Sequence, residues 1–168
     1  AEVQREAGEV SKQRFSRAAQ AARLLSPHLT GRDILEIACG TADFSLAAAE
    51  TARSVTAIDL DDCRLSPAAR SGGSVCFQRM DAAALSFPGG SFDTAVLYNA
   101  LGHLTAILPE VLSEALRVLR PGGALLVCSS FSLDKTAMEE HFLPLLSERG
   151  LPFSRREEGP FRILEIFR

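Results

Sequence analysis

The chain has 168 residues, of which 46% are hydrophobic and 23% charged, a composition that excludes a disordered protein and predicts a folded one. At this length we expect a single domain covering residues 1–168. The longest apolar runs are far shorter than the roughly 18 residues of a membrane-spanning helix, and no signal-peptide apolar block follows the charged N-terminus.

The net charge of −3 is unevenly distributed along the chain. Residues 1–32 carry six basic and three acidic residues and residues 149–168 carry five and three, whereas residues 33–148 carry seven basic and fifteen acidic residues. An acidic centre argues against nucleic acid as a partner and suits a neutral or cationic ligand. We interpret the basic ends as solvated faces of helices and strands, although they could reach an acidic substrate.

The four cysteines show neither a CxxC pair nor a metal-ligand spacing with the histidines. This pattern predicts no metal site and a reducing, cytoplasmic compartment.

Hydrophobic periodicity predicts alternating helices and strands along the whole chain. The first helix should bury the apolar face that contains Val10, Phe15, Ala18, Ala19, Ala22 and Leu25. The elements predicted for the first half are a helix over 9–26, a strand over 34–38, a small-residue turn over 39–42, a helix over 43–53, and strands over 54–59 and 74–79. Those predicted for the second half are a loop over 87–91, a strand over 92–98, a helix over about 108–119 with Pro109 in its first turn, a strand over 124–128, a helix over about 135–149, and strands over 153–156 and 162–167.

Apolar strands that alternate with helices predict an α/β fold, with a Rossmann-like, doubly wound seven-stranded sheet. The sheet should be mostly parallel, with an antiparallel C-terminal strand, because residues 157–160 leave no room for a crossover helix. Ligands of such sheets bind beyond the carboxyl ends of the strands, next to the first strand.

The turn after the first predicted strand is built from small residues. Ala38, Gly40 and Ala42 would let a ligand approach the backbone closely. A dinucleotide-binding turn has a glycine where this chain has Asp43, and a carboxylate at a helix N-terminus would repel a pyrophosphate. The turn therefore favours a nucleoside without phosphates, with a merely structural tight turn as the alternative.

Two further carboxylates follow the next two strands. Asp59 ends the second strand, where an acidic side chain can accept both hydroxyls of a ribose. Asp81 follows the third strand, where it could accept a hydrogen bond from a base amino group or cap a helix over residues 82–84. Together with Glu36, three acidic residues thus lie at or near three successive strand ends.

These residues resemble the motifs of a known family. Residues 34–43, Ile-Leu-Glu-Ile-Ala-Cys-Gly-Thr-Ala-Asp, resemble the first motif of class I S-adenosylmethionine-dependent methyltransferases, most closely the ubiquinone/menaquinone-biosynthesis-like group that acts on small molecules. Residues 81–93, 99–104 and 116–123 are similar to later motifs of that group. The resemblance covers about residues 33–128.

The resemblance implies a role for each matching position, with S-adenosylmethionine as cofactor and S-adenosylhomocysteine as product. Glu36 would lie near the methionine end, Ala38 and Gly40 would line the closest backbone approach, and Asn99 would lie near the transferable methyl group. Asp59 would hold the ribose, Leu60 would contact the adenine, and Asp81 with the Ala82 backbone would bind the adenine amino edge. The acidic centre would suit the positive charges of the cofactor.

The chain departs from the family pattern in two places. Ala42 replaces the usual last glycine of the turn, and its methyl group is expected to narrow the turn and weaken cofactor binding. Pro67 occurs where a longer helix is usual, which leaves the shape of the adenine side open.

Methyl transfer depends mostly on proximity and orientation, and needs a general base only if the nucleophile must lose a proton. His103 is the candidate base, and a packing or helix-start histidine is the alternative. Residues 99–102 are not the motif associated with amino-group methylation of nucleobases, and we expect Tyr98 to pack within its strand. Leu101, Leu104, Phe131 and Phe142 could line an apolar pocket or belong to the core, and residues 1–30 could form a helical cover over the site.

Three hypotheses follow. The first is a methyltransferase that acts on a small molecule, and the second is a non-catalytic domain that binds S-adenosylmethionine as a sensor or scaffold. The third is a nicotinamide-dependent dehydrogenase, against which Asp43 argues. Gly102 argues against it too, since it stands where a short-chain dehydrogenase would need lysine.

Overall fold

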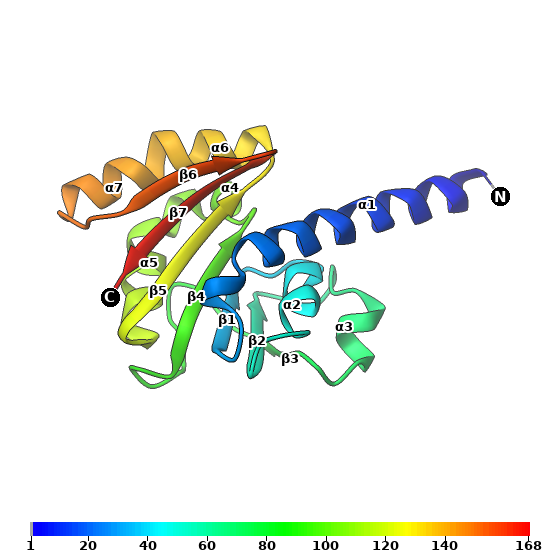
Figure 1. The fold of residues 1–168 in the computed structure, drawn as a ribbon, viewed down its shortest axis with the longest axis horizontal. Helices are drawn as coiled ribbons and strands as arrows, with labels where there is room; N and C mark the ends of the chain where they lie inside the picture. Colours follow the sequence, from blue (N-terminus) through cyan, green and yellow to red (C-terminus); the bar gives the residue numbers. More distant parts are fainter. Residues whose placement is uncertain (1) are drawn as a thin grey trace.

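The computed structural model describes residues 2–168 and contains one seven-stranded sheet with helices on both faces (Figure 1). The strand order is β3-β2-β1-β4-β5-β7-β6. The strands are β1 (Asp33–Ile37), β2 (Ser54–Asp59), β3 (Cys76–Arg79), β4 (Phe92–Tyr98), β5 (Leu119–Ser129), β6 (Ser154–Glu158) and β7 (Phe161–Phe167). Strands β1 to β5 pair in parallel, and β7 pairs antiparallel with both β5 and β6. The predicted doubly wound α/β sheet is confirmed, with β1 and β4 at the point where the strand order reverses direction.

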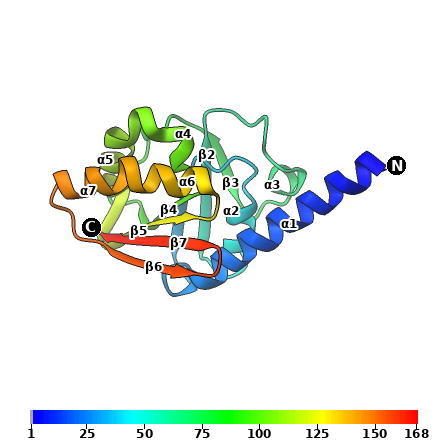
Figure 2. The same cartoon turned by 90° about the horizontal axis from the view of Figure 1, so that it is seen from above.

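Helices cover each face of the sheet in a separate group. One face carries α1 (Glu2–Leu24), α2 (Asp43–Ala48) and α3 (Pro67–Ser71), and the other carries α4 (Leu101–Leu104), α5 (Leu108–Val118), α6 (Ser132–Ala137), a π-helical turn (Met138–Phe142) and α7 (Leu143–Glu148). Short 3₁₀ helices occur at Ser26–His28 and Thr105–Ile107. Figure 2 shows α4 to α7 together on one side of β5 and β7.

The strands are apolar on both faces because both faces are covered. On β1, Ile34 packs in the cluster beneath α1 and α2, whereas Leu35 and Ile37 pack in the cluster beneath α4 to α7. The same alternation continues on β4, where Val96 faces the first cluster and Leu97 the second. Because alternate side chains are buried on opposite faces, a shift of one residue would exchange the two faces, so the register of the strands is fixed. In this register Glu36 lies on the face covered by α1 and α2.

Two predictions for helices on the α1 side are wrong in detail. Val10 and Phe15 are 55% and 42% exposed, because only the last third of α1 packs against the body and the rest extends beyond the sheet (Figure 1). The helix predicted over 43–53 ends at Ala48. The chain must turn there to enter β2, and Arg53 donates its backbone N–H to the Arg32 carbonyl at 2.9 Å.

In the second half, the strand predicted over 124–128 is longer than expected, because β5 begins at Leu119, directly after α5. The helix over 108–119 is confirmed as α5, with Pro109 in its first turn, and the last helical segment begins at Ser132 instead of 135. The link between β6 and β7 is shorter than predicted, because residues 157 and 158 belong to β6. Of the helices in residues 2–168, none is both long and apolar enough to cross a membrane.

Candidate functional site

The turn that follows β1 has an unusual backbone conformation. Ala38, Gly40 and Ala42 have φ values of +57°, +56° and +61°, which place three alternate residues in the left-handed region. An L-residue in this region costs about 1–2 kcal/mol, so the surrounding structure must hold the two alanines there. The backbone N–H of Cys39 donates to the Ile58 carbonyl and that of Ala42 to the Cys39 carbonyl, both at 2.9 Å. The turn is therefore fixed between β1 and β2, at the carboxyl edge of the sheet.

A cavity opens next to this turn. Its volume of about 420 Å³ is within the usual range for a pocket that binds a small ligand. Its lining comes from α1, the turn after β1, the start of α2, the loop after β2, and the segments that follow β4 and β5. The lining residues are Val10, Gln13, Arg14, Arg17, Ala38, Cys39, Gly40, Thr41, Asp43, Phe44, Arg64, Tyr98, Asn99, His103 and Phe131. Of the residues predicted to form the site, Ala38, Gly40, Asn99 and His103 thus lie around one cavity.

Glu36 lies behind the turn, with only 1% of its surface exposed. Its carboxylate accepts a hydrogen bond from the Ser45 backbone N–H at 3.0 Å and another from the Ser45 hydroxyl. Burial raises the pKa of Glu36 to about 8, because desolvation outweighs these two bonds. Since Ser45 belongs to α2, the acid also ties that short helix to β1.

Asp59 joins the end of β2 to the turn. One carboxylate oxygen accepts the Gly40 backbone N–H and the other accepts the N–H of Leu60, both at 2.8 Å. Each carboxylate oxygen has two acceptor positions, so both can accept a further hydrogen bond from a ligand. Leu60 is 68% exposed and lies outside the cavity.

Asp81 and Ala82 follow β3 at the same edge of the sheet. The Met80 backbone N–H donates to the Asp59 carbonyl at 2.8 Å, which extends the β2–β3 pairing up to Asp81. The Asp81 carboxylate accepts the Ala83 backbone N–H at 2.8 Å, so it closes a turn over residues 81–84 rather than capping a helix. Ala82 is buried, and neither residue lines the cavity.

Asn99 immediately follows β4 and adopts a positive φ of +48°. Its side-chain carbonyl accepts the Ser130 backbone N–H at 2.7 Å, and its amide donates to the Ser130 hydroxyl at 2.9 Å. These bonds connect the chain segments that follow β4 and β5. Asn99 therefore shapes the cavity as well as lining it.

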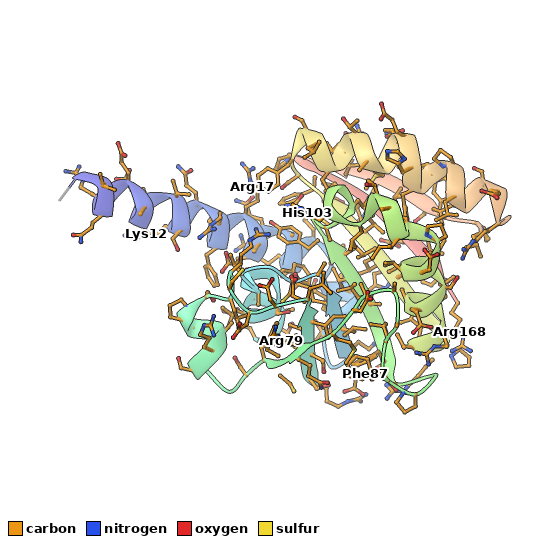
Figure 3. All side chains as sticks on the ribbon, turned by 180° about the vertical axis from the view of Figure 1, so that it is seen from behind. Lys12, Arg17, Arg79, Phe87, His103 and Arg168 are labelled. Atoms are coloured by element: carbon orange, nitrogen blue, oxygen red, sulfur yellow. The ribbon has the colours of Figure 1, made fainter. Side chains whose placement is uncertain are left out.

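His103 is exposed and belongs to the short helix α4. The helix is anchored to α6, because the buried Asp134 accepts the Gly102 backbone N–H at 2.9 Å and also binds the Ser129 hydroxyl. Figure 3 shows His103 near Arg17 of α1, and both residues line the cavity. His103 is thus open to a ligand and is not a core residue.

The four apolar candidates divide into two groups. Leu101, Leu104 and Phe142 are buried in the core beneath α4 to α7. Phe131 is 52% exposed and lines the cavity. Tyr98 also lines the cavity and stacks on Phe44, with 5.3 Å between the ring centroids, so it has a contact with the site that the sequence did not predict.

The structure accommodates both departures from the family motifs, Ala42 and Pro67, without disturbing the elements around them. The methyl group of Ala42 is fully buried in the core beneath α1 and α2, and Ala42 does not line the cavity. Pro67 begins the short helix α3, where Ser66 caps the helix by accepting the Ala69 backbone N–H at 3.3 Å. A proline suits the first turn of a helix because its missing N–H is not needed there.

Sequence reasoning missed the arginines of the cavity, Arg14, Arg17 and Arg64. A signal was present, because Val10, Gln13, Arg14 and Arg17 follow the i, i+3, i+4, i+7 spacing of one helix face. Arg14 and Arg17 are exposed, as expected for a solvated helix face, and they also line the cavity. Within the described residues, no group of three or more His, Cys, Asp or Glu side chains is placed to hold a metal ion.

Comparisons with known proteins agree with the motifs. Residues 34–123 match the family described as "Methyltransferase domain". The ubiquinone/menaquinone biosynthesis C-methyltransferase UbiE of Paracoccus denitrificans is 36% identical over 106 residues, which are 58% of this chain and 42% of that protein. The chain spans about 40% of the length of its first curated relatives.

Solved structures share the same fold. A putative S-adenosylmethionine-dependent methyltransferase from Methanococcus maripaludis matches with a TM-score of 0.75 and 16% identity, over 96% of this chain and 90% of that one. Phosphoethanolamine N-methyltransferase 1 of Haemonchus contortus, in complex with phosphoethanolamine and S-adenosylhomocysteine, matches with a TM-score of 0.60 and 29% identity, over 71% of this chain and 27% of that one. Because the family match covers more than half of the chain, the protein belongs to the class I S-adenosylmethionine-dependent methyltransferase family.

Proposed function

We propose that this protein binds S-adenosylmethionine at the carboxyl edge of the sheet and transfers its methyl group to a small-molecule acceptor in the cavity. The observation that carries the proposal is the left-handed turn at Ala38, Gly40 and Ala42, which opens on a cavity of about 420 Å³. Such a turn presents bare backbone to a ligand, and this one lies at the switch point of a doubly wound sheet.

The donors and acceptors at this edge fit an adenosyl cofactor without phosphates. Asp59 lies beside Gly40 and has free acceptor positions for two ribose hydroxyls. Asp43 lies at the start of α2 and lines the cavity, so a phosphate group there would meet a carboxylate. Asp81 and Ala82 extend the same edge over β3, where an adenine amino group would find an acceptor, with Leu60 as an apolar contact.

Glu36, Ala38, Gly40 and Asn99 would hold the methionine end. When bound, the cofactor supplies a methyl group on a positively charged sulfur, which a nucleophile can displace in line. The buried Glu36 carboxyl lies behind the turn, and a cationic ligand nearby would favour its ionised form.

His103 is the residue best placed to manage a proton. It lines the cavity from α4, across from α1, and an imidazole can take a proton from an acceptor near neutral pH. The wall of α1 and the Phe131 side chain would limit the access of water to the acceptor. This role for residues 10–17 agrees with the proposed N-terminal cover.

The test begins with Asp59→Ala, followed by calorimetric titration with S-adenosylhomocysteine. We expect binding to weaken by about 1–3 kcal/mol, because ligand hydroxyls lose a charged acceptor and the turn loses its bond to Gly40. Asp62→Ala is the matched control, because this exposed acid of the same loop pairs with Arg70 and should leave the affinity unchanged. Unchanged affinity in Asp59→Ala would refute the ribose contact.

Transfer itself is tested with labelled S-adenosylmethionine and a library of small acceptors. Label in a small-molecule product that is lost in His103→Ala supports both the activity and the proposed base. A protein that binds S-adenosylmethionine but labels no acceptor would favour the non-catalytic sensor or scaffold. Binding of NAD in place of S-adenosylmethionine would overturn the proposal.

A further inference from the structure

One wall of the cavity is basic, although it comes from distant parts of the sequence. Arg14 and Arg17 lie one helical turn apart on α1, and Arg64 belongs to the loop after β2. We call these three residues the basic wall. Among the residues that line the cavity, only Asp43 carries a carboxylate. None of the carboxylates described in residues 2–168 forms a salt bridge with a basic-wall arginine.

Arginines elsewhere on this sheet are used differently. Arg53 and Arg120, at the amino edge, each contact the carboxylates of both Asp33 and Asp93 within 3.1 Å. In these pairs the guanidinium N–H groups donate to carboxylates of the protein itself. The arginines of the basic wall form no such pairs among the described residues, so their N–H groups are free to donate to a ligand in the cavity.

The rest of the cavity is largely aromatic and apolar. The guanidinium carbon of Arg17 lies 5.9 Å from the centroid of the Phe131 ring, a cation–π distance that connects the basic wall to the aromatic side. Phe44 and Tyr98 stack on each other, and Val10 adds an aliphatic surface beside Arg14. Figure 3 shows Arg17 and His103 in the gap between α1 and α4.

Charge balance decides what this cavity can hold. The reactive end of S-adenosylmethionine carries a positive sulfur, a positive ammonium group and a carboxylate, so its net charge is positive, and three arginines next to it leave an excess of positive charge in the cavity. The guanidinium of Arg64 even lies about 3.4 Å from where a Gly40 Cβ would be, directly over the turn. An anion bound between the arginines and the cofactor would balance this excess.

We propose that the methyl acceptor is a small anion with an aromatic or apolar body, whose carboxylate or phosphate group is held by Arg14 and Arg17. This inference rests on the proposed function and narrows its substrate class. Guanidinium forks pair with both anions in the same way, and the Phe131 side chain offers a flat surface to the acceptor body. The methyl group would be received at an atom near His103.

The test uses calorimetric titration of the full chain with defined probes. S-adenosylhomocysteine is titrated first, and the saturated protein is then titrated with phenylacetate, phenyl phosphate and the neutral isostere phenylacetamide. We expect at least one anion to bind more tightly than the amide, and the two anions separate carboxylate from phosphate recognition. Equal binding of the amide and the anions, or no binding of either anion, would overturn the proposal.

Variants then assign the anion to the basic wall. Arg14→Gln combined with Arg17→Gln should weaken anion binding by roughly 10- to 100-fold, the loss expected for hydrogen bonds between charged groups. Arg23→Gln is the matched control, since Arg23 is exposed on the same helix but does not line the cavity. Unchanged anion binding in the double variant would refute the assignment.

A third readout separates this proposal from failure of the proposed function. The double variant should bind S-adenosylhomocysteine as tightly as the unmodified protein. If its S-adenosylhomocysteine affinity falls as far as its anion affinity, the arginines hold the carboxylate of the cofactor and the acceptor proposal is wrong. If the unmodified protein does not bind S-adenosylhomocysteine but still binds the anions through Arg14 and Arg17, the proposed function fails and the anion site remains.

Discussion

The two edges of the central sheet use the same kinds of residue in opposite ways. At the amino edge, Asp33 of β1 accepts hydrogen bonds from Arg53, Ser54 and Arg120, at distances between 2.6 and 3.0 Å. At the carboxyl edge, Glu36 of the same strand is buried with a raised pKa, and the arginines of the basic wall line a cavity and form no salt bridge within the part of the chain that the structure describes. One short strand thus carries an acid paired with arginines near its amino end and a buried acid bonded only to Ser45 near its carboxyl end.

Backbone conformation follows the same division. The non-glycine residues with positive φ among residues 2–168 are Ala38, Ala42 and Asn99, and all of them follow β1 or β4 at the carboxyl edge. Strained residues persist only where the surrounding structure holds them, and they concentrate at functional sites. We infer that the ion pairs of the amino edge stabilise the fold, whereas the left-handed residues of the carboxyl edge destabilise it and are held in place to shape the cavity.

The largest effect on stability is expected at the amino edge. Asp33→Ala removes one acceptor from two arginines and a serine, and we expect the free energy of unfolding to fall by about 2–3 kcal/mol at pH 7. The arginines hold the pKa of Asp33 well below its ordinary value of 3.8, so its stabilisation is present above that pH and is lost as the pH falls. Urea unfolding between pH 7 and pH 3 should show the difference between the two proteins shrinking in acid.

Glu157→Ala is the control for Asp33→Ala. Glu157 pairs with Arg162 but is half exposed, so water screens the pair and its loss should cost much less stability than the loss of Asp33. Equal losses in the two variants would contradict the special role of the amino edge.

A smaller effect with the opposite pH dependence is expected at the carboxyl edge. The pKa of Glu36 rises from its ordinary value of 4.5 to about 8 on folding, so the folded chain binds this proton more tightly than the unfolded chain does. Stability contributed by the protonated form is complete below pH 4.5 and decreases as the pH rises toward 8. Glu36→Gln should remove this decrease, so the free energy of unfolding of the variant, relative to that of the unmodified protein, should rise from pH 5 to pH 8.

Unfolding curves between pH 5 and pH 8 test this prediction. Glu148→Gln, on the exposed surface of α7, should follow the unmodified protein throughout. If Glu36→Gln also follows it, Glu36 does not carry the proposed pH dependence.

The smallest effect concerns the strain of the turn itself. Ala42→Gly relieves a left-handed alanine that costs about 1–2 kcal/mol, but loses a buried methyl group worth about 0.8 kcal/mol and increases the entropy of the unfolded chain. We expect the free energy of unfolding to change by less than about 1 kcal/mol. Because the methyl group faces the core, S-adenosylhomocysteine affinity should also stay the same, contrary to the expectation from sequence.

Ala47→Gly supplies the comparison for Ala42→Gly. Ala47 is also buried but lies inside α2, where a glycine loses both packing and helix propensity, so a loss of about 1–2 kcal/mol is expected. A large loss in both variants would mean that the turn is not strained at Ala42.

The residues of the sequence motifs show which parts of the candidate site could be predicted from local patterns. Local patterns located Ala38, Gly40, Asp59, Asp81 and Asn99 at strand ends, and parallel pairing brings all strand ends to one edge. The same patterns did not separate Phe131, which lines the cavity, from Phe142, which is buried in the core. Both are phenylalanines of the same helical region, at the cap of α6 and in the π-helical turn, and only the packing of that region decides which of them meets solvent.

The sequence by itself determined the α/β fold, the parallel strands and the small-residue turn after β1, because these depend on periodicity and on small residues at fixed spacing. Only the tertiary structure decided that Arg14 and Arg17 face a cavity. Helical periodicity defines a face of α1 but not its neighbour, and the neighbour is set by the angle at which the last third of α1 packs on α2. Two exposed arginines of the basic N-terminal segment, Arg14 and Arg17, thus form the wall of the cavity opposite His103, while the other basic residues of α1 face solvent.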